Sequence, residues 1–145
     1  MTIRRVSPQE AHTLMTEEGY LYLDVRSVPE FEGGHPTGAY NVPLLHSGAG
    51  GMQSNPDFLA VVEARFPKDS KLVVGCRAGS RSLKAVEQLQ AAGYSALVDQ
   101  RAGYAGARSP FGGLQEPGWS PAGLPVSTEA LEGRTYGALK TAAGK

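Results

Sequence analysis

The stretch KLVVGCRAGSRSL, residues 71–83, predicts a strand, a tight loop and the first turn of a helix, in that order. Its first five residues are rich in valine and leucine, which is typical of a buried strand. Apolar residues then recur at helical spacing from Leu83 as far as Gly93. Between the two lies a loop of small and basic residues that begins with Cys76, the only cysteine of the chain. A strand that runs through a short loop into a helix is the building unit of α/β proteins with parallel sheets.

The same alternation continues on both sides of this unit. Ser7 and Glu10 form a capping-box pattern, which predicts a helix that ends at Gly19. Asn55 is placed to cap a second long helix. The expected elements are helices over 8–18, 28–32, 56–66 and 83–93, strands over 20–25, 39–43, 71–75 and 96–99, and an exposed glycine-rich loop over 46–54. We therefore expect an α/β fold built on a mostly parallel sheet.

Length and composition exclude several classes of protein. The 145 residues are about one domain's worth of chain, and no apolar run approaches the roughly 20 residues of a membrane-spanning helix. A single cysteine excludes an intramolecular disulfide and a multi-cysteine zinc site, and the three histidines lack ligand-like spacing. A net charge of zero argues against bulk attraction to nucleic acid or a membrane surface. Since the first 20 residues lack the apolar segment of a secretory signal, we expect a cytoplasmic protein.

Cys76 is expected at a position that favours the thiolate. It would face backbone N–H groups without partners at the start of a helix, and the positive end of the helix dipole. Arg77 and Arg81 add positive charge, and the small residues between them let the loop curl into a cup of N–H groups that binds anions. A lone cysteine is more commonly a small buried hydrophobe, but such a residue needs neither two arginines nor an exposed loop. The residues thus predict a nucleophile inside an anion-binding loop.

Five segments, taken in order, resemble the rhodanese-homology sulfurtransferases, particularly the single-domain members of bacteria and the senescence-associated proteins of plants. These segments are Leu23–Arg26, Glu30–Phe31, Gly34–Pro43, Cys76–Ser82 and Ala122–Val126. The resemblance spans residues 3–126. It implies a rhodanese-like α/β fold with three layers, α/β/α, around a mostly parallel five-stranded sheet, and residues 1–126 as the rhodanese-like domain.

The resemblance also implies a reaction, which is sulfur transfer by covalent catalysis. Cys76 would attack the outer sulfur of a donor such as thiosulfate, become a persulfide, and pass this sulfur to cyanide or to a thiol, for example that of thioredoxin. The implied partners are therefore a small anionic donor and such an acceptor, with no cofactor, no metal, no nucleic acid and no membrane.

Around Cys76 the resemblance assigns roles residue by residue. Backbone N–H groups of the loop would hold the persulfide and the donor's oxygens, and they belong to Arg77, Ala78, Gly79, Ser80 and Arg81. The side chains of Arg77 and Arg81 are candidates for binding the donor, because a planar guanidinium suits oxyanions. The alternative for both arginines is ordinary solvated surface charge.

Four further residues match structural positions of the family. Asp24 and Arg26 resemble its structural pair, with Arg26 bonded to Glu30 and Asp24 close to the active loop. His35 lies in the family's glycine-histidine turn, where we expect it to brace the backbone.

Two segments depart from the family's pattern. Residues 105–118, rich in glycine and proline, separate Gly103-Tyr104 from Trp119 and read as an inserted loop close to the active face. The interpretation as a lid, a partner-docking loop or a disordered segment stays open. Residues 127–145 lie outside the resemblance and are thinly hydrophobic, which predicts a mobile tail.

Two other functions compete with sulfur transfer. Cysteine-dependent phosphatases and arsenate reductases use a Cys-x5-Arg loop, whereas only four residues separate Cys76 from Arg81 here, so the loop is one residue shorter. Some rhodanese-like domains are binding modules without activity, but those usually lack the cysteine. Fold by itself does not decide among these functions.

Overall fold

Five parallel strands form the central sheet of the computed structural model, which describes residues 2–145. In spatial order they are β1 (Arg5–Val6), β8 (Ala96–Gln100), β7 (Lys71–Gly75), β2 (Leu21–Asp24) and β4 (Tyr40–Asn41). Every neighbouring pair is parallel. The sheet confirms the predicted fold class, and only β1 was not anticipated, because two residues are too few for a periodic pattern.

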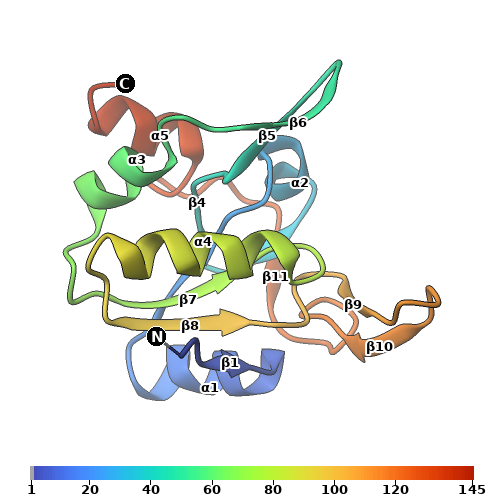
Figure 1. Ribbon diagram of the computed structural model, residues 1–145. Coiled ribbons are helices and arrows are strands. Elements are labelled where there is room, and N and C mark those ends of the chain that lie inside the picture. The colour runs from blue at the N-terminus through green and yellow to red at the C-terminus, as the bar shows by residue number, and fades with distance from the viewer. Residues whose placement is uncertain (1) are drawn as a thin grey trace.

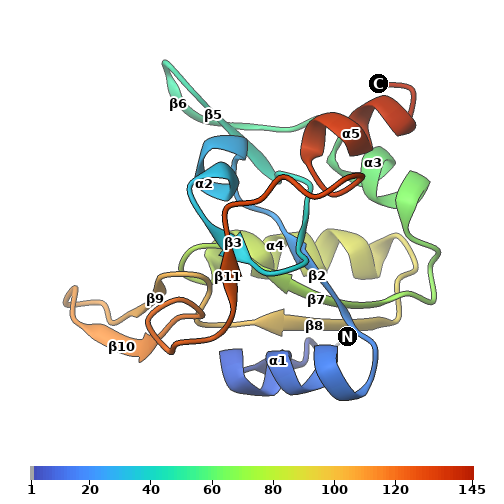
Figure 2. The same cartoon turned by 180° about the vertical axis from the view of Figure 1, so that it is seen from behind.

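Helices cover both faces of this sheet (Figure 1). They are α1 (Pro8–Glu17), α2 (Val28–Glu32), α3 (Phe58–Arg65), α4 (Ser80–Ala91) and α5 (Tyr136–Ala142). The first, α1, lies on one face, while α3, α4 and α5 lie on the other, and the view from behind agrees (Figures 1 and 2). The buried side chains accordingly form two clusters, one on each face of the sheet. The expected three-layer arrangement is confirmed.

Local sequence signals set most helix starts. Ser7 caps α1, and its hydroxyl and the Glu10 carboxylate satisfy each other's backbone N–H groups, as the capping box requires. The expected cap at Asn55 is wrong, since α3 begins only at Phe58, after Asp57. The Asn55 amide instead donates to the carbonyl of Pro43 at 2.9 Å and to the hydroxyl of Tyr136 at 3.1 Å. The Asn55 side-chain oxygen accepts the N–H of Asp57 at 3.0 Å, so Asn55 forms a local turn just ahead of α3 while distant groups bind its amide nitrogen.

The C-terminal residues pack against the domain, which differs from the mobile tail that the sequence predicted. Strand β11 (Val126–Ser127) pairs antiparallel with β3 (His35–Pro36). Helix α5 then buries Tyr136 and Leu139 in the same cluster as α3. A seven-residue helix with two buried side chains gives almost no periodic signal, so only the neighbours that cover it reveal its place.

Two antiparallel hairpins project beyond the sheet on the side where β7 and β8 end (Figures 1 and 2). One joins β5 (Leu45–Gly48) to β6 (Gly51–Ser54), where the sequence predicted an exposed loop. The other joins β9 (Gly106–Arg108) to β10 (Leu114–Pro117) and makes up most of the expected insertion. Both are largely exposed, which explains why they lack the apolar alternation of a half-buried strand. No helix in the described part of the chain has the length and apolar character needed to cross a membrane.

Candidate active site

Strand β7 lies in the middle of the sheet (Figure 1). Cys76 directly follows its carboxyl end, where ligands of open α/β sheets bind. The neighbouring strand β2 ends in register with it, since Asp24 pairs with Gly75. Cys76 is only 2% exposed and packs with side chains of α4, including Ala85 and Val86. The packing against α4 thus fixes the position of the thiol, and the loop that follows decides whether a substrate can reach it.

The loop curls around the sulfur atom. Gly79 donates its backbone N–H to Cys76 Sγ at 3.1 Å, and Ser82 Oγ lies 3.5 Å from the same sulfur. Gly79 has a left-handed conformation, with φ at +104°, and directly precedes α4. A Cβ at this position would overlap the carbonyl oxygen of Arg101, so both the conformation and the space require glycine. One N–H of the expected cup, that of Gly79, therefore points at the sulfur directly ahead of α4.

The segment after β8 fixes the outer side of this loop. Tyr104 donates its N–H to the carbonyl of Cys76 at 2.7 Å, and Ala105 donates to that of Arg77 at 2.9 Å. Because β9 begins directly afterwards, the inserted hairpin is tied to the active loop through its first residues. The expectation that residues 105–118 lie close to the active face is confirmed.

Arg81, on the first turn of α4, forms a two-pronged ion pair with Glu30 on α2, at 2.7 and 3.0 Å. Burial opposes ionisation of Glu30, but hydrogen bonds from Arg81 and Ser27 and the charge of Arg81 lower its pKa to about 2. The guanidinium of Arg81 is therefore engaged by a carboxylate within the protein, although its charge still acts on Cys76.

Arg26 has a different partner from the expected one. Its guanidinium donates to both oxygens of Asp24, at 2.8 to 3.1 Å, and to the carbonyl of Gly34 at 2.6 Å. The predicted bond between Arg26 and Glu30 is wrong, because Asp24 is only two residues away and shares its buried environment. Arg26 also stacks 4.3 Å from the ring centre of Tyr104. The Asp24–Arg26 pair thus links the end of β2 to the segment that supports the active loop.

His35 is buried and contacts the backbone of its own turn. Its Nδ1 lies 2.8 Å from the carbonyl oxygen of Phe31, and its ring stacks on the Phe31 ring at 3.8 Å between centres. A nitrogen facing a carbonyl must carry the proton. This contact fits the bracing role that the sequence predicted, and the ring lies on the α2–β3 turn, outside the loop of Cys76.

Positive side chains gather at the open side of the loop. Arg77 and Ala78 are exposed, and Ala78 lines a hollow of about 180 Å³ together with Arg5 and Arg101. Both of these arginines also pair with carboxylates, Arg5 with Asp99 and Arg101 with Glu116. Of the two arginines singled out in the loop, Arg77 is therefore the one that faces solvent.

Comparison with known proteins assigns the chain to a family. The rhodanese-like domain family matches residues 7–109, which include the whole Cys76 loop. The chain belongs to the rhodanese-like domain family. It is 41% identical over 121 residues to thiosulfate sulfurtransferase 16, chloroplastic, of Arabidopsis thaliana, covering 83% of this chain and 90% of that protein. It is 33% identical to thiosulfate sulfurtransferase 18 of the same plant, covering 88% of this chain and 85% of that protein.

A solved structure agrees with this family. The crystal structure of Rv0390 from M. tuberculosis superposes with a TM-score of 0.72 at 25% sequence identity, covering 89% of this chain and all of that one. The resemblance that the motifs indicated, and the rhodanese-like fold that it implied, are therefore confirmed.

This rhodanese-like domain also places residues at the sulfur that the sequence did not single out as site residues. Ser82 is fully buried beside Cys76, and Tyr22 lies close enough for the Cys76 charge to act on its hydroxyl. Burial keeps that phenol neutral by raising its pKa. Asp99, on β8, carries a carboxylate that is fully buried next to Arg5. The sequence offered only a weak hint of Ser82, because it lies in the first turn of α4, where serine is common.

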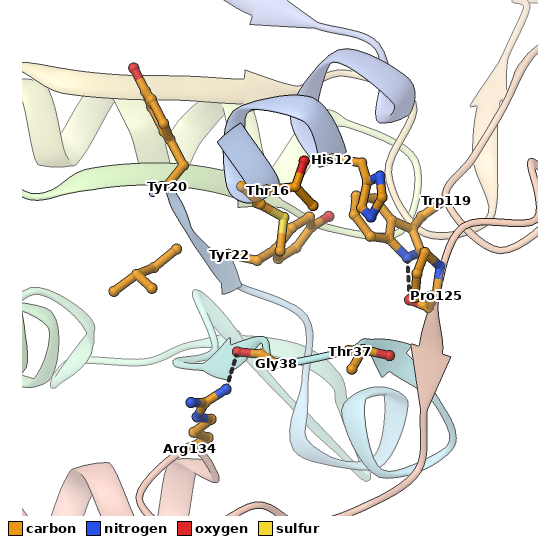
Figure 3. A pocket seen from close by; sticks show the side chains of 11 residues that line it. His12, Thr16, Tyr20, Tyr22, Thr37, Gly38, Trp119, Pro125 and Arg134 are labelled. Carbon is orange, nitrogen blue, oxygen red and sulfur yellow. Dashed lines mark hydrogen bonds between the residues drawn. The ribbon is translucent and has the colours of Figure 1, made fainter. Parts of the chain in front are cut away.

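A separate cavity of about 310 Å³ lies beside α1, on the other face of the domain (Figure 3). Trp119 and His12 meet edge-on at its wall, and the Trp119 indole donates to the carbonyl of Pro125 at 2.7 Å. Arg134 reaches it from the C-terminal segment and donates to the carbonyl of Gly38 at 3.0 Å. Its lining includes no residue of the Cys76 loop, so it is not part of the candidate active site.

Proposed function

We propose that this rhodanese-like domain is a thiosulfate sulfurtransferase in which Cys76 carries the transferred sulfur. The observation that supports this most is the loop geometry, with a buried Cys76 Sγ that accepts the Gly79 N–H at 3.1 Å at the start of α4. Such a setting stabilises negative charge on sulfur, because hydrogen bonds and the helix dipole both favour the anion.

The reaction has two displacement steps. In the first, the Cys76 thiolate attacks the outer sulfur of thiosulfate, the S–S bond of the donor breaks, and sulfite leaves with the bonding electron pair. The product is a Cys76 persulfide anion. In the second, cyanide or a thiolate attacks the outer persulfide sulfur, so thiocyanate or an acceptor persulfide leaves and the Cys76 thiolate returns. No net oxidant or reductant is needed in either step.

The loop contributes differently from what its sequence suggested. Its backbone N–H groups, from Arg77 to Arg81, would hold the anionic outer sulfur and the donor oxygens. The exposed Arg77 would attract the dianionic donor, because Arg5 and Arg101 nearby are already paired with Asp99 and Glu116. We assign Arg81 a field effect on the sulfur, because Glu30 already occupies its guanidinium.

The acceptor must come from outside the chain. Cys76 is the single cysteine, so no second thiol of the same chain can remove the sulfur. A small thiol or a protein thiol such as that of thioredoxin fits this requirement, and cyanide serves in the assay.

Thiocyanate formation from thiosulfate and cyanide tests the proposal. The wild type should produce thiocyanate, Cys76→Ser should produce none, and mass spectrometry after thiosulfate alone should find one added sulfur atom on Cys76. Absence of both turnover and added sulfur would refute it. Hydrolysis of p-nitrophenyl phosphate in place of sulfur transfer would instead favour the phosphatase alternative, and partner binding by an inactive parent would favour a binding module.

A further inference from the structure

Asp99 is a fully buried carboxylate with one unsatisfied oxygen. Its Oδ2 accepts from Arg5 Nε at 2.7 Å, while Oδ1 has no hydrogen-bond partner among residues 2–145. Burial raises the pKa of the Asp99 carboxyl, and the nearby Ser82 hydroxyl and Arg5 guanidinium oppose that rise. A buried carboxylate oxygen without a donor destabilises the fold. A nearby hydroxyl that donates to it would therefore be strongly favoured.

Ser82 contacts the nucleophile, and its hydroxyl also lowers the pKa of the Asp99 carboxyl. It is fully buried in the first turn of α4, and its Oγ lies 3.5 Å from Cys76 Sγ. As a thiol, Cys76 donates its proton to Ser82 Oγ, and Ser82 donates its own proton to the carbonyl of Gly79 at 3.3 Å. A hydroxyl has one proton to donate. When Cys76 loses its proton, the thiolate and Asp99 compete with the Gly79 carbonyl for the single proton of Ser82.

We propose that Ser82 is a positioning residue whose single hydroxyl proton is shared between the Cys76 thiolate and the buried Asp99 carboxylate, so that Asp99 restrains the reactivity of the nucleophile. The inference deepens the proposed function and rests on it only for its biological meaning, because thiol reactivity is measurable without sulfur transfer. Ser82 stabilises the thiolate form of Cys76 by donating a hydrogen bond to the sulfur. Asp99 reduces this stabilisation by accepting the same hydroxyl proton.

The charged groups around the pair are few and identifiable. Arg5 from β1 and Arg101 after β8 act on Asp99. Around Cys76, Arg81 contributes positive charge and the buried Tyr22 stays neutral. Asp24 also acts on Tyr22 and Arg81, and its ion pair with Arg26 is the same in every variant, so differences between the alkylation profiles report on Ser82 and Asp99.

The test is the rate of Cys76 alkylation by iodoacetamide between pH 4 and 10, measured by mass spectrometry. Ser82→Ala should slow alkylation at pH 6 by about tenfold, the equivalent of one hydrogen bond to a charged group. The rates should converge at high pH, where every thiol is ionised. Ser82→Thr keeps the hydroxyl and should restore a profile near that of the wild type.

Asp99→Asn should have the opposite effect. It removes the anionic competitor, so the hydroxyl is free to donate to sulfur, and alkylation at pH 6 should become several-fold faster. In the Ser82→Ala background the same substitution should change the rate much less, because the hydroxyl that mediates the effect is gone. An equal gain in both backgrounds would show that Asp99 acts through its charge alone and would overturn the proposal.

Exposed positions supply matched controls. Ser95→Ala and Asp69→Asn change the same residue types away from the site and should leave the profile unaltered. Circular dichroism checks that each variant is folded. If Asp99→Asn fails to fold, the comparison of wild type, Ser82→Ala and Ser82→Thr still decides, since an unchanged profile for Ser82→Ala refutes the proposal. Thiocyanate formation in the wild type reports separately on the proposed function.

Discussion

Arg81 and Glu30 join the helix that carries the active loop to a short helix 51 residues earlier in the chain, through two hydrogen bonds of 2.7 and 3.0 Å. Both side chains are mostly buried, with 14% and 24% of their surfaces exposed. The pair holds α2 against the start of α4 and engages the Arg81 guanidinium with a carboxylate of the protein. The two arginines of the loop therefore have different environments, since Arg81 is paired with Glu30 and Arg77 is exposed.

Removing the Glu30 carboxylate should destabilise the domain. Glu30→Gln keeps the shape but loses the charge that Arg81 requires, so the free energy of unfolding should fall by about 1–2 kcal/mol. Urea unfolding at pH 7 measures this loss, and Glu32→Gln, an exposed change on the same helix, serves as the control.

Acid should abolish the difference between wild type and Glu30→Gln. The folded pKa of Glu30 is about 2, against an ordinary value of 4.5, so its contribution to stability is complete above about pH 4.5 and disappears as the pH falls towards 2. The difference in free energy of unfolding between the two proteins should therefore become smaller from pH 7 to pH 4 and smaller again at pH 3. A constant gap down to pH 3 would contradict the assignment of the stabilisation to the ion pair.

Gly79→Ala should disrupt the active loop. The new Cβ would overlap the Arg101 carbonyl oxygen, and the left-handed conformation adds strain, for a combined cost of about 3 kcal/mol and a large loss of sulfur transfer. Gly51→Ala is the matched control, because Gly51 also has a positive φ, of 96°, but open space around it. It should cost only about 1 kcal/mol. Equal losses for the two variants would contradict the steric argument.

Arg77→Ala should raise the KM for thiosulfate about tenfold while kcat changes little, because an exposed guanidinium attracts and binds the dianion before the sulfur moves. Steady-state kinetics at low and high salt check this, since the effect should shrink as ionic strength rises. Arg108→Ala, exposed on the inserted hairpin, provides the comparison. A fall confined to kcat would instead place Arg77 in the chemical step.

The C-terminal helix should contribute to stability. Leu139→Ala deletes a side chain that is 4% exposed against α3 and should cost about 2–4 kcal/mol in the free energy of unfolding. Leu131→Ala, at a position that is 36% exposed, should cost less than about 1 kcal/mol. Thermal and urea unfolding distinguish the two. A negligible effect at Leu139 would restore the interpretation of residues 127–145 as a mobile tail.

Elements whose signals are local were predictable. The capping box at Ser7, the apolar strand before Cys76 and the helix after it rest on neighbouring residues, and the structure contains each of them. The hairpins and α5 were not predictable, because their few apolar residues form no period. The expected cap at Asn55 was two residues too early, since Asn55 accepts the N–H of Asp57 in a turn that precedes the helix, and Asp57 occupies the cap position.

The sequence by itself determined the setting of Cys76, because a strand, a glycine-containing loop and a helix in direct succession place it between strand and helix whatever the rest of the chain does. Only the tertiary structure decided which charges and hydroxyls meet there. Arg26 pairs with Asp24, Arg81 with Glu30, and Ser82 Oγ lies 3.5 Å from Cys76 Sγ. The physical reason is that backbone conformation follows from local preferences, whereas the partner of a buried charge is whichever group the packing of distant elements brings within hydrogen-bond distance.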